Sequence, residues 1–200
     1  CKLDNANREH SVPEWVLEKQ IRKFQVPFFN EGINEITINR SHVWDKYKVS
    51  SDELFLATKN FDQKTPYHNM TLDKHCMNSY RLFANKLYYG RFVNEKQCED
   101  PFSKGARLHD IGKLRTQTFD DDGVAHYFGH AEYGSYVILS QMQLPFGWDK
   151  EDLLDCCFLV NYHMMPFAWN TEKIKRRWKE RFGEYKYQML LDFHECDIAR

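Results

Sequence analysis

Histidine and aspartate residues recur in this sequence in a pattern that could hold metal ions. His109 and Asp110 are adjacent, and Ile111-Gly112-Lys113 follows them. Other candidate ligands lie before and after this pair, each on a segment that we expect to be a separate helix: His75, His130, His163 and Asp197. Helical proteins build central metal sites in this way, from side chains on facing helices. The spacing therefore predicts one metal site made by all of these residues together.

The donor types suit one or two divalent cations. Imidazole nitrogen binds Zn, Fe and Ni well, and carboxylate oxygen suits Mg and Mn, so the identity of the metal stays open. With Asp110 bridging two ions, such a pair could clamp a phosphoryl group and activate a water for in-line attack. Lys113, one helical turn beyond Asp110, could neutralise phosphate charge. Asp110 and Lys113 are therefore the candidate catalytic residues.

Each of these residues also has an ordinary structural interpretation. The chain has 9 histidines, and a single histidine is more often a surface or core residue than a ligand. We expect such ordinary positions for His10, His42, His126 and His194. Near the end of the chain, His194 could compete with Asp197 as the ligand, because it lies one turn earlier on the same helix face, and Asp192 is a further acidic neighbour.

Apolar residues at three- and four-residue spacing predict the helices that would carry the site. After an irregular segment over 41–68, we expect helices over about 71–90, 102–113, 129–144, 150–163, 171–183 and 185–200. Asp120 to Gly123 should form a turn. The sequence thus predicts an all-α fold: a helical bundle over 41–200 with a short N-terminal helix-strand appendage over 1–40.

The appendage is expected to hold one helix and one strand. Ser11, Pro13 and Glu14 are typical of a helix start, and Val26-Pro27 of a helix end, so we expect a helix over about 12–24. Alternating polar and β-branched residues predict a strand over Glu35–Asn39. A lone strand is not stable. We therefore expect its partner strands in a preceding segment and the chain to be part of a longer protein.

Composition limits the classes of function. The 200 residues are 42% hydrophobic and 16% aromatic, with a net charge of -1, which allows a buried core and gives no global bias toward nucleic acid or membrane. No apolar run approaches the ~20 residues that span a bilayer, so we expect no membrane partner. The 6 cysteines form no CxxC pair, which favours free thiols in the cytoplasm. The oligomeric state stays open.

Positive charge is concentrated between Lys173 and Arg181. A solvated helix face is the favoured interpretation. Alternatively, this segment could follow a phosphate backbone near the metal site, with Trp169 or Trp178 stacked on a base.

The string Arg107-Leu108-His109-Asp110-Ile111-Gly112-Lys113 resembles the signature of the HD superfamily of metal-dependent phosphohydrolases. The stretch from Thr116 to Gly129 is similar to the subgroup found with tRNA nucleotidyltransferases and polynucleotide kinases. The resemblance covers about residues 66–200 and implies an HD-domain helical bundle over that part of the chain. It implies metal-ligand roles for the residues at the matching positions: His75, His109, Asp110, His130, His163 and Asp197.

This resemblance implies an enzyme that hydrolyses a phosphomonoester or cyclic phosphodiester of a nucleotide or of an RNA or DNA end. Lys113, Arg115 and His68 are the candidate substrate-binding residues. His68 matches a histidine that the subgroup often carries, and its role could equally be packing. The alternative is a non-catalytic regulatory module that binds a nucleotide or metal. A deoxynucleotide triphosphohydrolase is a poorer match.

Residues 1–40 are more faintly similar to the end of a P-loop polynucleotide-kinase-like domain. The phosphate-binding loop GxxxxGK[ST] is absent, so this similarity implies no kinase activity for the chain. It would associate the hydrolase with RNA end repair, and it makes 1–40 a possible remnant of a kinase-like domain.

Overall fold

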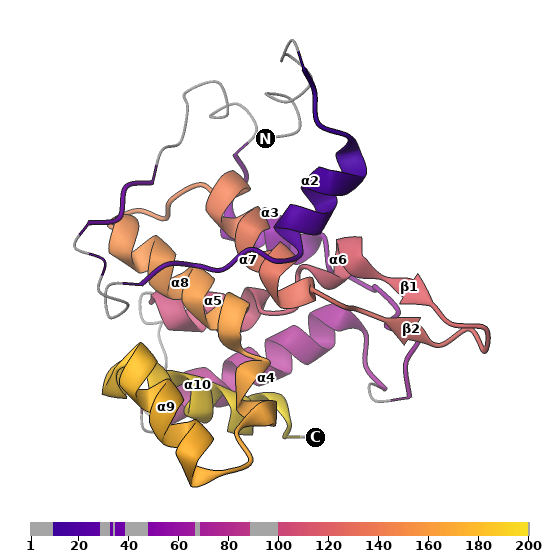
Figure 1. Ribbon diagram of the computed structural model, residues 1–200. Helices are drawn as coiled ribbons and strands as arrows, with labels where there is room; N and C mark the ends of the chain where they lie inside the picture. Colours follow the sequence, from indigo (N-terminus) through magenta and orange to yellow (C-terminus); the bar gives the residue numbers. More distant parts are fainter. Residues whose placement is uncertain are drawn as a thin grey trace.

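The computed structural model describes residues 10–28, 33, 35–38, 48–66, 69–88 and 100–199. Helices dominate these residues, in agreement with the predicted all-α class, and two short strands pair as an antiparallel hairpin (Figure 1). In chain order the elements are α2 (Glu14–Ile21), α3 (Ser51–Leu56), α4 (Leu72–Leu87), α5 (Pro101–Leu108), α6 (Lys113–Thr116), β1 (Thr118–Phe119), β2 (Ala125–His126), α7 (His130–Gln141), α8 (Lys150–Tyr162), the 3-10 helix η4 (Met165–Ala168), α9 (Glu172–Phe182) and α10 (Glu184–Asp197).

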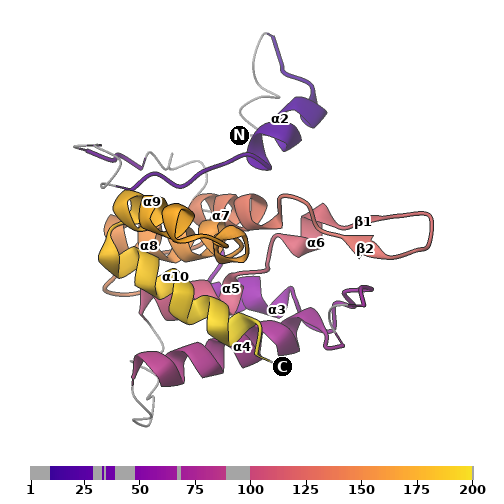
Figure 2. The same ribbon diagram turned by 60° about the horizontal axis from the view of Figure 1, so that its bottom comes forward.

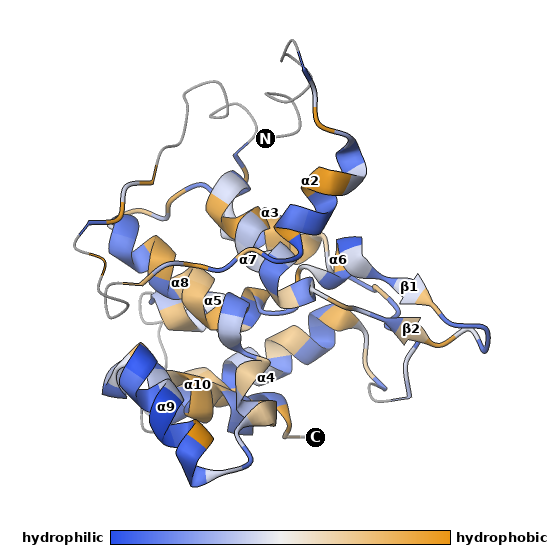
Figure 3. Cartoon of the chain, viewed as in Figure 1, coloured by the Kyte–Doolittle hydropathy of each residue, from blue (hydrophilic) through white to orange (hydrophobic). Residues whose placement is uncertain are grey.

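Helices α5 and α8 form the centre of the bundle. α8 packs against α5 and α7, while α4 packs against α5 and α10 (Figure 2). From Leu153 to Tyr162, every α8 residue except Asp155 is buried. A helix enclosed on several sides needs apolar residues all round, and Figure 3 shows the contrast between the largely hydrophobic α8 and the hydrophilic α9. The end of α8, where His163 lies, is therefore deep in the molecule.

Local capping signals determine where the helices next to the site begin. At α8, the Asp149 carboxylate accepts hydrogen bonds from the backbone N–H groups of Glu151 and Asp152. Asp100 caps α5 in the same way. Before α7, Gly129 has a φ of 77°, a conformation that favours glycine because it has no Cβ. These starts fix the position of each following residue around its helix axis.

The prediction of one continuous helix over 102–113 is wrong at its C-terminal end. α5 ends at Leu108, and a turn over 109–112 precedes α6. The turn lies directly on the first residue of α7. A Cβ on Gly112 would lie 1.9 Å from the carbonyl oxygen of His130 and 2.7 Å from the backbone nitrogen of Gly134. Only glycine allows this approach, and the bend places His109 and Asp110 against α7.

Besides α6, three further short features were not predicted: two helices and a hairpin. α3 falls in the segment 41–68 expected to be irregular, and its start is fixed by a capping box between Ser50 and Glu53. The hairpin β1–β2 encloses the turn predicted at Asp120 to Gly123, and Figures 1 and 2 show it extending away from the helices. The third is η4, directly after α8. Elements this short carry too little periodicity for a sequence pattern to reveal them.

The N-terminal segment differs from the prediction in both of its elements. α2 is shorter than the expected helix over 12–24. The strand predicted over Glu35–Asn39 is not formed in its described part, because residues 35–38 have no regular structure. A strand needs a partner for its backbone hydrogen bonds, and none is found among the described residues. Ile36 is instead buried in the helical core.

Residues 24–28 lie across α8 and α7. The backbone N–H of Val26 donates to Asn161 Oδ1 (3.0 Å), and Asn161 Nδ2 donates to the carbonyl of Phe24 (3.1 Å). The Tyr162 hydroxyl donates to the carbonyl of Val26 (3.1 Å). Val26 and Phe28 belong to the same hydrophobic core as α8. This part of the predicted appendage therefore shares the core of the bundle.

Within the described ranges, no helix is long and apolar enough to cross a membrane. The cysteines described there are buried and form no disulfide: Cys76, Cys156, Cys157 and Cys196.

Replacement of Gly112 by alanine should destabilise the protein strongly, because the new methyl group would overlap the His130 carbonyl. We expect the free energy of unfolding to fall by about 3 kcal/mol or more, at or beyond the upper end for overpacking. Gly123→Ala is the control. Gly123, unlike Gly112, has a positive φ, and no atom lies within 4 Å of an added Cβ, so only a backbone cost of about 1–2 kcal/mol should appear. Urea unfolding measures both, and equal stability of the two variants would contradict the close contact.

Candidate metal centre

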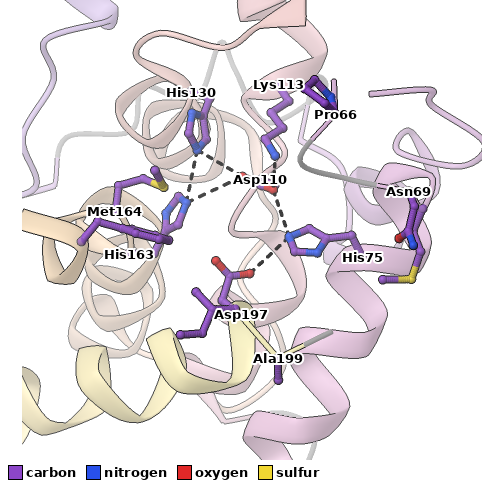
Figure 4. Close-up of a pocket in the computed structure, with 13 residues that line it drawn as sticks. Pro66, Asn69, His75, Asp110, Lys113, His130, His163, Met164, Asp197 and Ala199 are labelled. Carbon is purple, nitrogen blue, oxygen red and sulfur yellow. Dashed lines mark hydrogen bonds and ion pairs between the residues drawn. The ribbon is translucent and has the colours of Figure 1, made fainter. Parts of the chain in front are cut away.

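The structure brings together all the ligands expected from the sequence, each at or near the end of an element. Figure 4 shows five of them, all but His109. His75 lies in the first turn of α4, and His109 and Asp110 lie in the turn after α5. His130 is the first residue of α7, His163 directly follows α8, and Asp197 is the last residue of α10.

Asp110 lies between two pairs of histidines. Its Oδ2 is 3.4 Å from His75 Nε2 and 3.3 Å from His109 Nε2. Its Oδ1 is 3.1 Å from His130 Nε2 and 3.7 Å from His163 Nε2. The two oxygens of one carboxylate thus face two separate groups of ligand atoms. This arrangement can hold two ions with Asp110 between them.

The spacing within the first group fits a bound ion. Asp197 Oδ1 lies 3.2 Å from His75 Nε2 and 3.1 Å from His109 Nε2, and these two nitrogens are 3.2 Å apart. Metal–ligand bonds of roughly 2.0–2.2 Å place neighbouring ligand atoms about 2.8–3.6 Å apart in octahedral or tetrahedral geometry. The second group is similar, with 3.2 Å between the Nε2 atoms of His130 and His163.

Backbone carbonyls orient three of the imidazole rings. Nδ1 of His109, His130 and His163 each lies 2.8 Å from the carbonyl oxygen three residues earlier. A carbonyl can only accept, so Nδ1 carries the proton and donates. In the neutral ring the lone pair is then on Nε2, the atom that faces Asp110. This second-shell pattern is typical of metal-binding histidines.

Lone pairs this close together repel each other unless a positive charge lies among them. Burial alone would raise the pKa of Asp110 and Asp197, yet Lys113 and His109 hold that of Asp110, and His109 that of Asp197, well below the usual range. Burial alone would lower the pKa of His109, but the two carboxylates raise it well above its usual value. Burial lowers the pKa of His163. The donor set therefore favours a cation among these atoms.

Lys113 contacts the same carboxylate. Its Nζ lies 2.7 Å from Asp110 Oδ2 and donates to Gln63 Oε1 (2.9 Å), and it lies 5.3 Å from the centre of the Tyr127 ring. Gln63 is itself held by hydrogen bonds from its Nε2 to the Met70 carbonyl (3.1 Å) and from the Tyr127 hydroxyl to its own carbonyl (2.5 Å). Neither Gln63 nor Tyr127 was predicted as part of the site. Gln63 lies in an irregular segment, where no periodicity marks it.

Asp197 occupies the position for which His194 and Asp192 were alternatives. The Ser79 hydroxyl, one turn after His75 on α4, lies 3.1 Å from Asp197 Oδ1. His194 contacts the Phe167 ring instead, and Asp192 pairs with Lys86 (2.9 Å). Ser79 was also missed, although its spacing from His75 could have marked it as lying on the same helix face.

A pocket of about 480 Å³ opens over the centre. Most of the ligands and Lys113 line it, together with Asn69 and several apolar residues: Pro66, Met70, Met164, Phe167, Ile198 and Ala199. Arg115 is exposed and lies outside the lining. It is two positions after Lys113 on α6, and side chains two positions apart on a helix point to nearly opposite sides. His68, the other predicted substrate contact, lies outside the described residues.

The basic segment forms α9. Ile174, Trp178 and Phe182 pack toward the core, whereas Lys175 and Lys179 pair with Glu172 and Glu184 (2.7 and 2.8 Å). No residue of α9 lines the pocket. Trp169 is buried and stacked on Tyr187, with ring centres 4.8 Å apart. These contacts agree with a solvated helix face. Trp169 is too deeply buried to stack on a base, and Trp178 is half-buried against Phe182.

Comparisons of the chain with models of protein families, with curated proteins and with solved structures found no match.

The ligand assignment on α10 can be tested with two variants. Asp197→Asn should weaken binding of Mn²⁺ or Zn²⁺ by more than the roughly 10- to 100-fold that loss of an outer-shell partner costs. His194→Gln, on the same helix, should leave the affinity nearly unchanged. Isothermal titration calorimetry measures both. A larger loss in His194→Gln than in Asp197→Asn would reverse the assignment.

Metal binding should weaken as the pH falls. The carboxylates of Asp110 and Asp197 raise the pKa of His75 and His109, so protons on these two rings compete with the metal, whereas burial lowers the pKa of His163. Below the pKa of His109, the association constant should drop about tenfold per pH unit for each displaced proton. Titrations in two buffers of different ionisation enthalpy would count the released protons. An affinity independent of pH would contradict this competition between protons and metal.

Proposed function

We propose that this chain is a metal-dependent phosphohydrolase of the HD superfamily. It would hydrolyse a phosphomonoester or cyclic phosphodiester of a nucleotide or of a nucleic-acid end. The observation that carries the proposal is the division of the two Asp110 oxygens between two histidine pairs. Two adjacent ions, each of Mn, Fe, Ni, Mg or Zn, would fit these groups. Bound there, they would polarise phosphoryl oxygens and lower the pKa of a water molecule.

The two ligand groups differ in how many protein atoms they offer. His75, His109 and Asp197 share the first group with Asp110, whereas His130 and His163 are the partners of Asp110 in the second. Structural metal sites have their positions filled by protein, and catalytic sites keep positions open for water or substrate. Both groups reach the pocket, since only His109 is missing from its lining. The smaller number of protein ligands in the second group therefore supports catalysis there.

Lys113 supplies the positive charge that phosphate requires. It lines the pocket and is buried, and Asp110 and Gln63 hold its ammonium group in place. A cation fixed in advance stabilises charge in the transition state without reorganisation. Asp110 would hold the two ligand groups in a fixed position relative to each other, because each of its oxygens contacts one histidine pair. Neither role requires a residue to move a long way.

The alternative is a regulatory module that binds a nucleotide or metal without turnover. The ion pair between Lys113 and Asp110 is the observation that favours it, because a buried lysine can serve as a structural partner. The association with RNA end repair and the cytoplasmic location also belong to the proposal. They rest on the resemblance of residues 1–40 and on the cysteine pattern.

Two variants should separate metal binding from phosphate binding. Asp110→Ala should abolish turnover and lose metal, because both ligand groups depend on it. Lys113→Ala should keep its metal and lose on the order of 10²–10³ in rate, as when one electrostatic stabiliser is removed. The measurements are bound metal per chain and hydrolysis of 2′,3′-cyclic and terminal phosphates.

Lys74→Ala is the matched control, since Lys74 is an exposed cation next to His75 on α4, and it should retain full rate. Full activity of Lys113→Ala would overturn the phosphate role. If wild-type protein with its metals restored hydrolyses no phosphoester tested, the binding module becomes the preferred function.

A further inference from the structure

One side of the pocket is apolar and exposed. Met164, Phe167 and Ile198 line the pocket and are 43%, 56% and 51% exposed. A single exposed apolar residue needs no explanation, but a group of them around a polar centre is typical of a ligand site. A ligand that fills this pocket would combine a charged end at the metal centre, the phosphate under the proposed function, with an apolar group at the other end.

The apolar residues are positioned by the metal ligands themselves. Met164 directly follows His163, and Ile198 directly follows Asp197. Phe167 lies on η4, one turn beyond Met164. Figure 4 shows Met164 beside His163, on the other side of the centre from Asn69. The apolar wall thus lies at a fixed place relative to the point where phosphate would bind.

Phe167 projects from a rigid base. Pro166 and Trp169, before and after it in the sequence, are buried, and the backbone N–H of Trp169 donates to the Pro166 carbonyl (3.0 Å). Trp169 is held further by its stacking on Tyr187. A ring mounted in this way loses little conformational entropy when a ligand packs on it.

At least one face of the Phe167 ring is left uncovered by its neighbour. Its ring centre lies 4.4 Å from that of His194, with 87° between the planes. In an edge-to-face pair, one ring presents only its edge to one face of the other. Whichever ring presents the edge, His194 covers no more than one face of Phe167. The 56% exposure of the side chain agrees with an uncovered ring.

We propose that Phe167 stacks on the planar base of a nucleoside phosphate, with Met164 filling the space beside it. This rests on the proposed function, because the metal centre and Lys113 would hold the phosphate of the same molecule. Stacking tolerates any base, because every base has a π-face, and the methionine side chain adapts to different shapes. The pocket would therefore discriminate nucleotides from sugar phosphates without a base and would distinguish poorly among bases.

The experiment compares ligands with and without a base. The adenosine monophosphate (2′, 3′, 5′ or 2′,3′-cyclic) that wild-type protein hydrolyses fastest would be paired with the matching ribose phosphate. Binding of adenosine, which has no phosphate to hydrolyse, would be followed separately by ligand-observed NMR. The variants are Phe167→Ala, Phe167→Tyr, which keeps the ring, and the control Phe146→Ala, which removes an exposed phenylalanine outside the pocket lining.

Phe167→Ala should raise KM for the nucleotide by about 5- to 100-fold, the range expected for loss of one base–aromatic stack. It should leave the ribose phosphate unchanged and weaken adenosine binding. Phe167→Tyr and Phe146→Ala should behave like wild type. Equal losses for nucleotide and ribose phosphate, or no loss for either, would overturn the stacking role.

The adenosine measurement separates this inference from the proposed function. If no phosphoester is hydrolysed but Phe167→Ala still abolishes adenosine binding, the aromatic subsite stands and the hydrolase does not. If hydrolysis occurs but adenosine binds equally well to wild type and Phe167→Ala, the hydrolase stands and the subsite is wrong.

Discussion

This structure depends on one buried carboxylate, both of whose oxygens need hydrogen-bonding or positively charged partners. Asp110 is almost fully enclosed, and an ionised group in such a place is tolerated only when paired. Its partners come from α4, α6, α7 and the end of α8. These elements must therefore meet at one point, and the contacts of α5 with α4 and α8 provide the framework that brings them there.

The positions of the ligands at element ends follow from backbone chemistry. The last carbonyls of a helix have no partner within that helix. His109 and His163 each directly follow a helix, and their Nδ1 atoms donate to such carbonyls, those of Ala106 and Val160. This one hydrogen bond gives the helix carbonyl a partner, places the ring proton on Nδ1 and directs Nε2 toward Asp110. Stability and ligand orientation are thus obtained from one interaction.

The pocket joins two kinds of chemistry. Around Asp110 and Lys113 it is charged, and around Met164 and Phe167 it is apolar. Both proposals depend on this division, since hydrolysis concerns the charged side and base recognition the apolar one. A molecule that carries a phosphate and a flat ring would satisfy both sides at once, whereas inorganic phosphate or a lipid chain would satisfy one.

The sequence by itself determined the helical class, because apolar periodicity is a local property. It also named the residues that converge, through their types and the motif around His109 and Asp110, although they lie far apart in the chain. Tertiary structure decided which oxygen of Asp110 meets which histidine, and that Asp197 rather than His194 faces the centre. It also decided that Gln63 holds Lys113, that Arg115 points away, and that residues 35–38 form no strand. A helix pattern leaves rotation about the axis and the choice of partners undetermined. Here these were set by close contacts between distant segments, such as that of Gly112 with the His130 carbonyl.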